Sequence, residues 1–317
     1  MRALVAGLLL VVVLVGAAAA AIGLRTGSGE VAGTVSLTVT RDFGAERLGS
    51  EDDAHARTGD TVMRLLERDF DVRTRYGGGF VQEIDGASGG RLGTHPVDWF
   101  YYVNGIESSS GAAQRKVAAG DQIWWDHHVW QAAQRIPAVV GSFPEPFVAG
   151  EEGRRIPVKL VCAGGVRRPC DEVAQRLTDA GATGLSRATV GQGPGEGVLR
   201  VIVGRWADVR RDPVARTLER GPAASGVFAR FDPVGRRLEL LDEVGDTVRT
   251  LEQGAGLVAA TAQQGQAPTW LVTGTDQVGV DAAAAALQED RLRDHFAVAI
   301  SAGHDIPLPT AEPGAGP

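Results

Sequence analysis

The sequence is poor in cysteine, poor in lysine and without an excess of positive charge. Two cysteines among 317 residues are too few for a disulfide-rich scaffold or a zinc ribbon. A formal net charge of −7 argues against a nucleic-acid-binding protein, which would show a basic patch or stripe. Only Lys116 and Lys159 are lysines, and the arginine, alanine and glycine content is typical of a GC-rich genome. Composition therefore excludes several classes of protein and selects no function.

Common catalytic signatures are also scarce. The sequence has no S-x-x-K and no H-E-x-x-H motif, and His295 and His304 lie near the end without an obvious nucleophile. Catalytic groups can be far apart in sequence, so one alternative is a surface-exposed hydrolase with its site near Asp212, Asp281 or His295. The scarcity of motifs favours a protein without catalytic activity.

An uncharged apolar run occupies the N-terminus. Residues 3–24 carry no charge and are flanked by Arg2 and Arg25. Residues 17–21 offer small side chains at the A-x-A spacing that signal peptidase recognises. About twenty residues of helix would also span roughly 30 Å of hydrocarbon, so an uncleaved anchor is the alternative. We therefore predict a signal peptide or an N-terminal membrane anchor over residues 1–24, and an exported chain, extracellular or at the cell surface, beyond it.

The two cysteines acquire meaning from this predicted location. Cys162 ends an apolar strand expected over residues 158–162, and Cys170 lies at the start of a helical pattern. In an oxidising compartment the C-x7-C spacing favours a short-loop disulfide worth roughly 2–3 kcal/mol. Two free buried thiols are the alternative, because the spacing alone does not fix the geometry.

The residues after the apolar run predict a first domain of the α+β class. A short polar stretch over residues 25–33 is typical of a linker. A helix capped by Asp60 is predicted, and the periodicity predicts strands over residues 34–40, 80–84, 99–103 and 122–126. We expect these elements to form a domain over residues 34–134, a β-grasp-like sheet crossed by one helix.

A second domain, of the α/β class, is expected after a proline-rich linker over residues 135–156. Strand and helix patterns alternate over residues 157–306, which favours helices packed on a largely parallel sheet. The stretch that begins at Val201 resembles the stretch that begins at Trp270, which indicates a duplicated βαβ unit. Residues 307–317 contain four prolines and are expected to form a disordered tail.

Aromatic residues are concentrated in the last two expected strands of the first domain. Side chains alternate between the faces of a strand, so Trp99 and Tyr101 point one way, while Trp124 and Trp125 point to opposite faces. One helix can cover only one face of the sheet, which would leave part of this aromatic surface to a planar ligand or a protein partner. The alternative is that the rings complete the core and the interface between the domains.

Three motifs of the first domain carry a family resemblance. They are the pattern from Thr58 to Leu66, the run Trp99-x-Tyr101-Tyr102-Val103-Asn104-Gly105, and the run Gly120-Asp121-Gln122-Ile123-Trp124. Together they resemble the bacterial transcobalamin-like C-terminal domain family over about residues 34–130. The resemblance implies a tight turn at Asn104-Gly105. It also makes cobalamin a candidate cofactor, since the similar domain of the vertebrate cobalamin carriers closes over the corrin ring. The helical barrel of those carriers has no counterpart in the second domain.

Four further motifs allow both a binding role and a structural role. After the last aromatic strand, Asp126-His127-His128 could offer one imidazole to a corrin cobalt, and a solvated strand end is the favoured alternative. The acidic run Glu51-Asp52-Asp53 lacks the spacing of a calcium loop and is expected to be a solvated loop cluster. The glycines of residues 191–197 precede a strand, which favours a hairpin loop over a phosphate cradle. Residues 274–276 suit an anion site or an ordinary helix N-cap.

The sequence thus predicts an exported, non-enzymatic binding protein that presents an aromatic sheet to a small planar ligand, such as a corrinoid, or to a protein partner at the cell surface. A surface hydrolase and a structural envelope protein are the alternatives. No metal, no nucleic acid and no cofactor other than cobalamin is expected, and the membrane is a partner only through an uncleaved N-terminus. The expected ligand-binding residues are Trp99, Tyr101, Asn104, Trp124, Trp125 and His127.

Overall fold

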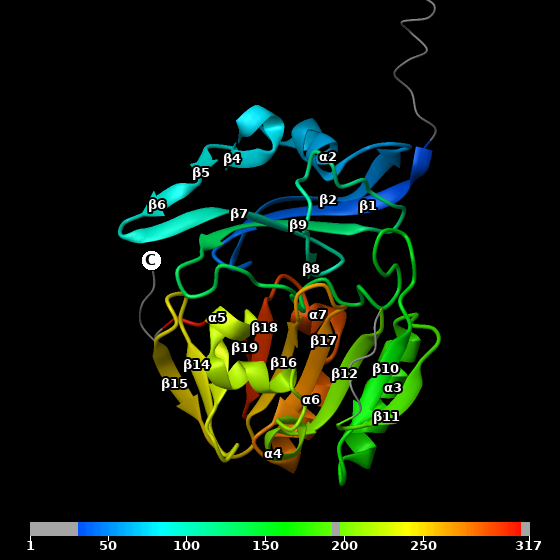
Figure 1. The fold of residues 1–317 in the computed structure, drawn as a ribbon, viewed down its shortest axis with the longest axis vertical. Coiled ribbons are helices and arrows are strands. Elements are labelled where there is room, and N and C mark those ends of the chain that lie inside the picture. Colours follow the sequence, from blue (N-terminus) through cyan, green and yellow to red (C-terminus); the bar gives the residue numbers. More distant parts are fainter. Residues whose placement is uncertain (1–30, 192–196, 312–317) are drawn as a thin grey trace, which may run out of the picture.

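A computed structural model describes residues 31–191 and 197–311, which form two domains stacked on each other (Figure 1). The N-terminal domain extends from β1 (Val31–Arg41) to β9 (Gln122–Val129), and the C-terminal domain from β10 (Val158–Cys162) to β19 (His304–Leu308). Over these residues the fold is mixed α+β, with several sheets and few helices, which confirms the expected fold class. The apolar run at the N-terminus lies outside the described residues, and within them no helix is long and apolar enough to cross a membrane.

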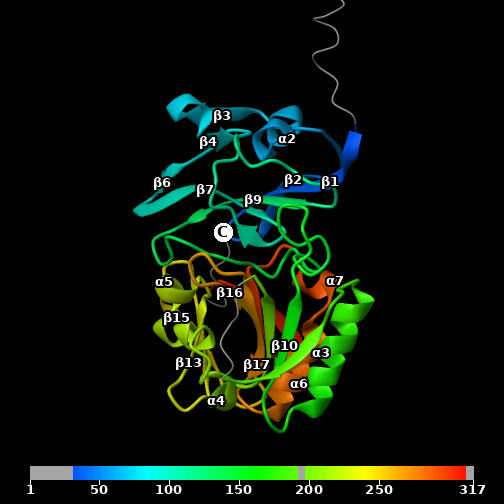
Figure 2. The same cartoon turned by 45° about the vertical axis from the view of Figure 1, so that its right-hand side comes forward.

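One six-stranded sheet forms the base of the N-terminal domain. The remaining elements of the domain are β2 (Glu46–Arg57), α2 (Val62–Asp69), β3 (Val72–Arg75), η1 (Tyr76–Gly78), β4 (Phe80–Ile84), β5 (Ala87–Ser88), β6 (Gly90–Leu92), β7 (His95–Val103) and β8 (Ile106–Glu107). The sheet has the order β2-β1-β9-β7-β6, with β8 paired to β7. β1 runs parallel to β9, and the other neighbours are antiparallel. α2 and the small sheet β3-β4-β5 lie over the face turned away from the C-terminal domain (Figures 1 and 2).

The helix α2 begins one residue later than the sequence predicts. Thr61 is its N-cap, and its side chain accepts a hydrogen bond from the backbone N–H of Arg64 at 3.3 Å. The predicted cap, Asp60, instead accepts the backbone N–H of Arg57 at 2.7 Å and pairs with Arg68. The Asp60 carboxylate is therefore occupied by the preceding turn, and the next residue with a hydroxyl caps the helix.

The acidic run at Glu51 and Asp52 lies in a strand, which corrects the expectation of a loop. These residues belong to β2, which forms an edge of the sheet and pairs only with β1. Three register shifts, near Val31, Val35 and Val39, let the polar strand follow the twisted β1 over its full length. The exposed carboxylates on this edge disfavour pairing with a strand of another chain.

The C-terminal domain is built on a seven-stranded mixed sheet in the order β11-β10-β12-β17-β16-β18-β19. Its strands are β11 (Ser186–Thr189), β12 (Leu199–Arg205), β13 (Ala229–Phe231), β14 (Leu238–Leu241), β15 (Thr247–Leu251), β16 (Gly256–Thr261), β17 (Thr269–Gly274) and β18 (Ala297–Ser301). Its helices are α3 (Arg167–Asp179), α4 (Trp206–Val209), η2 (Ala215–Arg220), α5 (Pro222–Ser225), α6 (Gln277–Ala286) and α7 (Glu289–Leu292). β10, β11, β12 and β17 are parallel, whereas β16, β18 and β19 join by antiparallel pairing. Figure 2 shows α3 and α6 on one face of this sheet and β13 to β15 on the other.

The two similar stretches of this domain do not form a duplicated unit. β12 and β17 are parallel neighbours, but three short helices, α4, η2 and α5, follow β12, and the chain then enters β13 in a separate three-stranded sheet. After β17 the ten-residue α6 packs against the sheet and the chain returns to it as β18. Gly279 permits this packing, since a Cβ there would lie 2.1 Å from the carbonyl oxygen of Ala255.

The segment between the domains is a buried layer. Val139 donates its backbone N–H to Gly105 of the N-terminal domain at 2.9 Å, and Val140 donates to Phe296 of the C-terminal domain at 3.2 Å. Farther along, the buried ring of Phe147 lies 5.0 Å from that of Trp270. The residues expected to form an extended linker therefore join both domains through backbone bonds and apolar packing.

At the C-terminus, β19 extends to Leu308, two residues into the segment expected to be a tail. Thr310 then donates its backbone N–H to the carbonyl of Leu241 at 3.0 Å. Residues 312–317 lie outside the described residues, as do residues 192–196 of the predicted glycine loop.

Candidate functional site

Two predicted ligand-binding rings, those of Trp99 and Trp125, lie beneath α2 and the small sheet. Both are buried in the core of the N-terminal domain, with Leu65 of α2 as a member of the same core. The Trp99 indole N–H donates to the carbonyl of Ala87 at 2.8 Å. Tyr101 stacks on Trp125, with ring centroids 4.8 Å apart. This face of the aromatic sheet is therefore covered by its own domain.

The opposite face is covered by the C-terminal domain. Trp124 and Tyr102 are buried in a core that both domains share, and their ring centroids lie 5.1 and 5.6 Å from that of Phe296. The Trp124 indole N–H donates to the hydroxyl of Thr40 at 2.7 Å. The expectation of an exposed aromatic sheet is wrong. α2 and the small sheet cover one face of it, and the C-terminal domain covers the other. The other alternative is correct: the rings complete the core and the interface between the domains.

The two histidines after the aromatic strand are packed as well, so neither forms a solvated strand end. His128 is buried, and its Nδ1 lies 2.8 Å from Oδ1 of Asp126. Its ring stacks between those of Phe43 and Phe100, with centroid distances of 4.5 and 4.4 Å. His127 is half-buried beside Trp99, and this burial lowers its pKa from the ordinary value.

Asn104 occupies the tight turn that the family resemblance implies. The φ angles of Asn104 and Gly105 are 55° and 72°, as a two-residue hairpin of type I′ requires. The Asn104 side-chain amide donates to the carboxylate of Asp121 and to the carbonyl of Gly150, both at 2.9 Å. Its oxygen accepts the backbone N–H of Gln122 at 2.8 Å. A fully bonded, buried amide of this kind holds three segments together and has no group free for a ligand.

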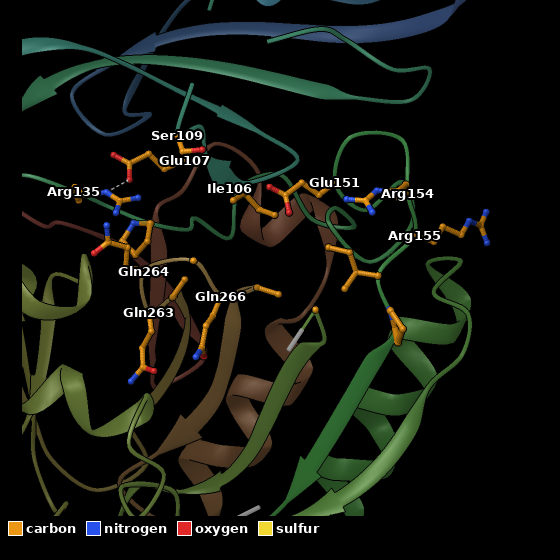
Figure 3. Close-up of a pocket in the computed structure, with 17 residues that line it drawn as sticks. Ile106, Glu107, Ser109, Arg135, Glu151, Arg154, Arg155, Gln263, Gln264 and Gln266 are labelled. Carbon is orange, nitrogen blue, oxygen red and sulfur yellow. Dashed lines mark hydrogen bonds and ion pairs between the residues drawn. The ribbon is translucent and has the colours of Figure 1, made fainter. Parts of the chain in front are cut away.

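A cavity of about 470 Å³ lies where the two domains and the buried layer meet (Figure 3). The N-terminal domain contributes the end of β8, the layer contributes residues on both sides of its apolar part, and the C-terminal domain contributes the loop between β16 and β17. Its lining combines apolar and polar side chains. The apolar ones include Ile106, Pro137 and Ile156, and the polar ones include Glu107, Arg135, Glu151, Arg154 and Gln264. Its volume falls within the usual range for small-ligand sites, and its place at a domain interface is a common one.

Of the charged groups of this cavity, only Glu107 and Arg135 form an ion pair among the described residues. Arg135 donates through Nε to Glu107 at 2.8 Å, which fixes one ion pair at one side. Glu151 and Arg154 lie on a hairpin closed by reciprocal backbone bonds of 3.0 Å, and Figure 3 shows their side chains next to each other. Among the described residues, Glu151 and Arg154 form no ion pair, either with each other or with a third residue. Arg155 points away from the cavity in Figure 3 and donates to Thr183 at 3.2 Å.

Two of the predicted site residues hold the walls of this cavity from behind. Through its bond to Gly150, Asn104 fixes the hairpin that carries Glu151 and Arg154. The Tyr101 hydroxyl donates to the carbonyl of Ser110 and lies 2.6 Å from Ser108 Oγ, and so fixes the serine run that follows β8. Burial raises the pKa of Tyr101, which keeps its phenol protonated as a donor.

The sequence contains only a weak signal for the cavity itself. Its polar walls come from the charged turn at residues 151–155, the glutamine-rich loop at residues 263–266 and a single arginine at residue 135. Each is an ordinary polar loop, and more than a hundred residues separate the first two. Their convergence depends on the buried layer, which the sequence indicates only as a proline-rich connection.

The residues considered for a hydrolase lie on separate elements. Asp212 is fully buried, pairs with Arg200 and accepts the backbone N–H of Val214 at 2.9 Å. Asp281 lies on α6 and accepts from Gln277 at 2.9 Å. His295 precedes β18 and is half-buried, which lowers its pKa. Asp212 and Asp281 thus have hydrogen-bond partners of their own.

The spacing G-x-S-x-G does occur once, at residues 86–90, and Ser88 is its central serine. The Ser88 hydroxyl donates to the carboxylate of Glu83. The imidazole Nε2 of His127 lies 3.1 Å from the Ser88 carbonyl oxygen and contacts no hydroxyl there. β5 ends at this residue and β6 follows, so the strand-to-helix elbow of a hydrolase nucleophile is not formed.

The anion and metal motifs have structural roles where the chain is described. Asp276 is the N-cap of α6 and accepts the backbone N–H groups of Gly279 and Gly254, both at 2.9 Å. Its carboxylate fills the position that an anion would need. Over residues 31–191 and 197–311, no three or more histidine, cysteine, aspartate or glutamate side chains are grouped so that they could hold a metal ion.

Cys162 and Cys170 form a disulfide, with Cα atoms 6.0 Å apart. It joins the end of β10 to the first turn of α3, beside the buried core of the C-terminal domain. The expectation of a disulfide is confirmed.

Comparisons with known proteins concern mainly the N-terminal domain. Residues 59–128 match the family model described as "Domain of unknown function (DUF4430)". A crystal structure from Ruminococcus gnavus ATCC 29149, described as that of a "putative metal binding protein", is similar at 17% sequence identity and a TM-score of 0.24, and the match covers 31% of this chain and 97% of that one. No curated protein matches the chain. From α2 to β9, this chain is thus similar to a domain family that has no assigned function.

Proposed function

We propose that this protein is an exported, non-enzymatic binding protein and that its binding site is the cavity between its two domains. The observation that carries the proposal is the convergence of Glu151, Arg154 and the Glu107–Arg135 pair on one cavity of about 470 Å³. Polar groups placed around an apolar patch fix the orientation of a ligand, while the patch supplies affinity. Export is supported by the uncharged run at residues 3–24, which has the composition of a signal peptide or anchor.

A relation of the N-terminal domain to transcobalamin-like domains is part of this proposal. The Asn104-Gly105 turn and the aromatic strands support it, since these are the features that carry the resemblance. Corrinoid binding by the aromatic sheet has less support, because Trp99, Trp124 and Trp125 are all buried. We therefore expect hydroxocobalamin to leave the tryptophan fluorescence unchanged after correction for its own absorbance.

The site is tested with a reporter placed on the cavity wall. Both native cysteines are in the disulfide, so the variant Ser109→Cys can be labelled at one position with an environment-sensitive dye. The matched control carries the dye at the exposed Ser50 of β2, away from the cavity. An acidic octapeptide, a basic octapeptide, a tetragalacturonate and hydroxocobalamin serve as probes.

We expect at least one probe to shift the emission of the dye at position 109 in a saturable way and to leave the dye at position 50 unaffected. Gln264→Trp should abolish the shift, because the indole would occupy the cavity from an exposed loop without changing the core. If no probe moves the emission at position 109 more than at position 50, the proposal is wrong.

A further inference from the structure

An exposed aromatic ring lies at one end of the small sheet of the N-terminal domain. Tyr76 is 86% exposed, more than any other large hydrophobic side chain of the described residues. It begins η1 with a φ of 54°, in the left-handed region that a residue with a Cβ rarely adopts. A tyrosine here adds almost no buried area and costs backbone strain, so the fold alone would be better served by glycine.

The Tyr76 ring borders a hollow of about 400 Å³ at the outer side of the N-terminal domain. The ring of Phe80 lines the same hollow, and the two ring centroids lie 6.4 Å apart with an angle of 67° between their planes. Phe80 and Gln82 alternate along β4 with Val81, which points into the core of the domain, so both face away from that core. The hollow therefore has an aromatic wall, and it shares no lining residue with the cavity between the domains.

Two acceptor atoms of the hollow are free for a ligand. One carboxylate oxygen of the half-buried Asp98 accepts the indole N–H of Trp130 at 3.1 Å, and the other accepts no hydrogen bond from the described residues. The Gln82 amide donates to the carbonyl of Gly89 at 2.7 Å, which leaves its oxygen as an acceptor. A Cβ at residue 89 would lie 2.4 Å from Oδ1 of Asp98, so the glycine keeps this oxygen accessible.

The charges of the hollow favour a neutral ligand. Arg75 and Asp98 are its only charged residues in the described chain, and they carry opposite signs. Arg75 is exposed and forms no ion pair among the described residues, so its N–H groups are donors for a ligand. Aromatic rings beside a carboxylate can also bind an organic cation, but the guanidinium of Arg75 would repel one.

The lining also favours a ligand that is both apolar and rich in hydroxyl groups. A purely aromatic ligand would cover the rings and leave the carboxylate, the amide and the guanidinium without partners. A sugar ring has hydroxyls that donate to Asp98 and Gln82 and accept from Arg75, while its C–H face packs on an aromatic ring. In a β-linked glucosyl unit the substituents are equatorial, so the axial C–H groups form a flat apolar face.

We propose that this hollow binds a neutral, β-linked oligosaccharide, with one pyranose ring packed on Tyr76. The site goes beyond the proposed function, because it lies on a different part of the N-terminal domain from the cavity. It accounts for the exposed ring, for the left-handed backbone that presents this ring and for the glycine at residue 89.

The test is saturation-transfer NMR on the soluble protein, with cellotetraose and chitotetraose as probes. We expect saturation to reach the axial protons of one ring face more strongly than the other sugar protons. Tyr76→Gly should weaken the binding at least tenfold and leave the thermal unfolding midpoint unchanged or higher, since glycine adopts this φ without strain. Tyr76→Phe keeps the ring and should stay within threefold of the wild type.

The matched control is Val278→Ala, which truncates another exposed apolar side chain, on α6 of the C-terminal domain, and should change the dissociation constant less than twofold. Absence of saturation transfer to both sugars at about 5 mM would overturn the proposal. Equal binding by Tyr76→Gly and the wild type would overturn the site, and tighter binding of choline than of either sugar would overturn the ligand class. None of these results bears on the cavity, which the dye at position 109 tests separately.

Discussion

Phe296 provides the sharpest test of how firmly the two domains are joined. Its ring is buried and lies 5.2 Å from Phe43, 5.1 Å from Trp124 and 5.4 Å from His128, measured between centroids. Each of these rings belongs to the N-terminal domain, while Phe296 belongs to the C-terminal one. Phe296→Ala removes the shared partner and leaves a void that the rigid sheet above cannot fill.

The expected loss follows from the burial of this ring. Replacement of a buried phenylalanine by alanine costs about 3–5 kcal/mol of unfolding free energy. The edge-to-face contacts, each worth about 0.5–1.5 kcal/mol, place this site in the upper part of that range. With an m-value of about 3 kcal/mol per molar urea, the midpoint should fall by about 1.3–1.7 M. Phe296→Leu keeps most of the volume and should lose less than half as much.

The assay is urea unfolding followed in parallel by tryptophan fluorescence and far-UV circular dichroism. Because one core contains residues of both domains, wild-type protein should unfold in one transition with coincident probes. Phe296→Ala should also weaken the binding of any probe to the cavity, because the cavity walls come from both domains. An unchanged midpoint, or two separate transitions in the wild type, would show that the domains are independent and that the cavity has no fixed shape.

Three further predictions concern stability. Replacement of Cys162 and Cys170 by alanine opens a loop with a sequence separation of 8 and should cost about 2.5 kcal/mol of unfolding free energy, measured by urea unfolding, whereas dithiothreitol should leave the double variant unaffected. Burial lowers the pKa of His127 below its ordinary 6.5, so the unfolded chain binds more protons and stability falls as the pH drops through about 6.5. Between pH 7.5 and pH 5, the thermal unfolding midpoint of His127→Gln should therefore fall less than that of the wild type. An equal fall would contradict this. Asp212→Asn leaves the buried Arg200 without its charge partner and should cost about 3–5 kcal/mol of unfolding free energy. Replacement of both residues by apolar ones of similar volume should restore most of this stability. Equal stability of the two variants would contradict the prediction.

Local patterns were sufficient for many elements and failed where tertiary contacts decide. The strands predicted over residues 80–84 and 158–162 have the bounds of β4 and β10. β2 was missed because its edge position tolerates polar residues on both faces, so it lacks the alternation of a half-buried strand. The antiparallel pairing of β16, β18 and β19 was missed because a fully buried strand has the same apolar composition whichever way it runs.

The site was hidden for a different reason. Its polar residues come from the end of β8 and from loops in other parts of the chain, so no spacing within one segment connects them. The expected site residues had clear patterns because the fold requires them: aromatic alternation fills two cores, and an Asn-Gly pair forms a hairpin turn. A pattern that is specific for an architecture is therefore weak evidence for a ligand.

The same residues nevertheless carry information about the site, at one step removed. Asn104 and Tyr101 each lie at the end of the aromatic strand, and each uses its polar atoms to fix a loop that borders the cavity. Asn104 donates to the carbonyl of Gly150 and Tyr101 to the carbonyl of Ser110, and these bonds reduce the freedom of the loops that they hold. Loops with fixed backbones and unpaired charges at their tips, as at Glu151 and Arg154, are what a preorganised binding surface requires. Motifs in this chain thus identify residues that support the cavity, whereas the residues proposed to contact a ligand belong to polar loops that carry no motif.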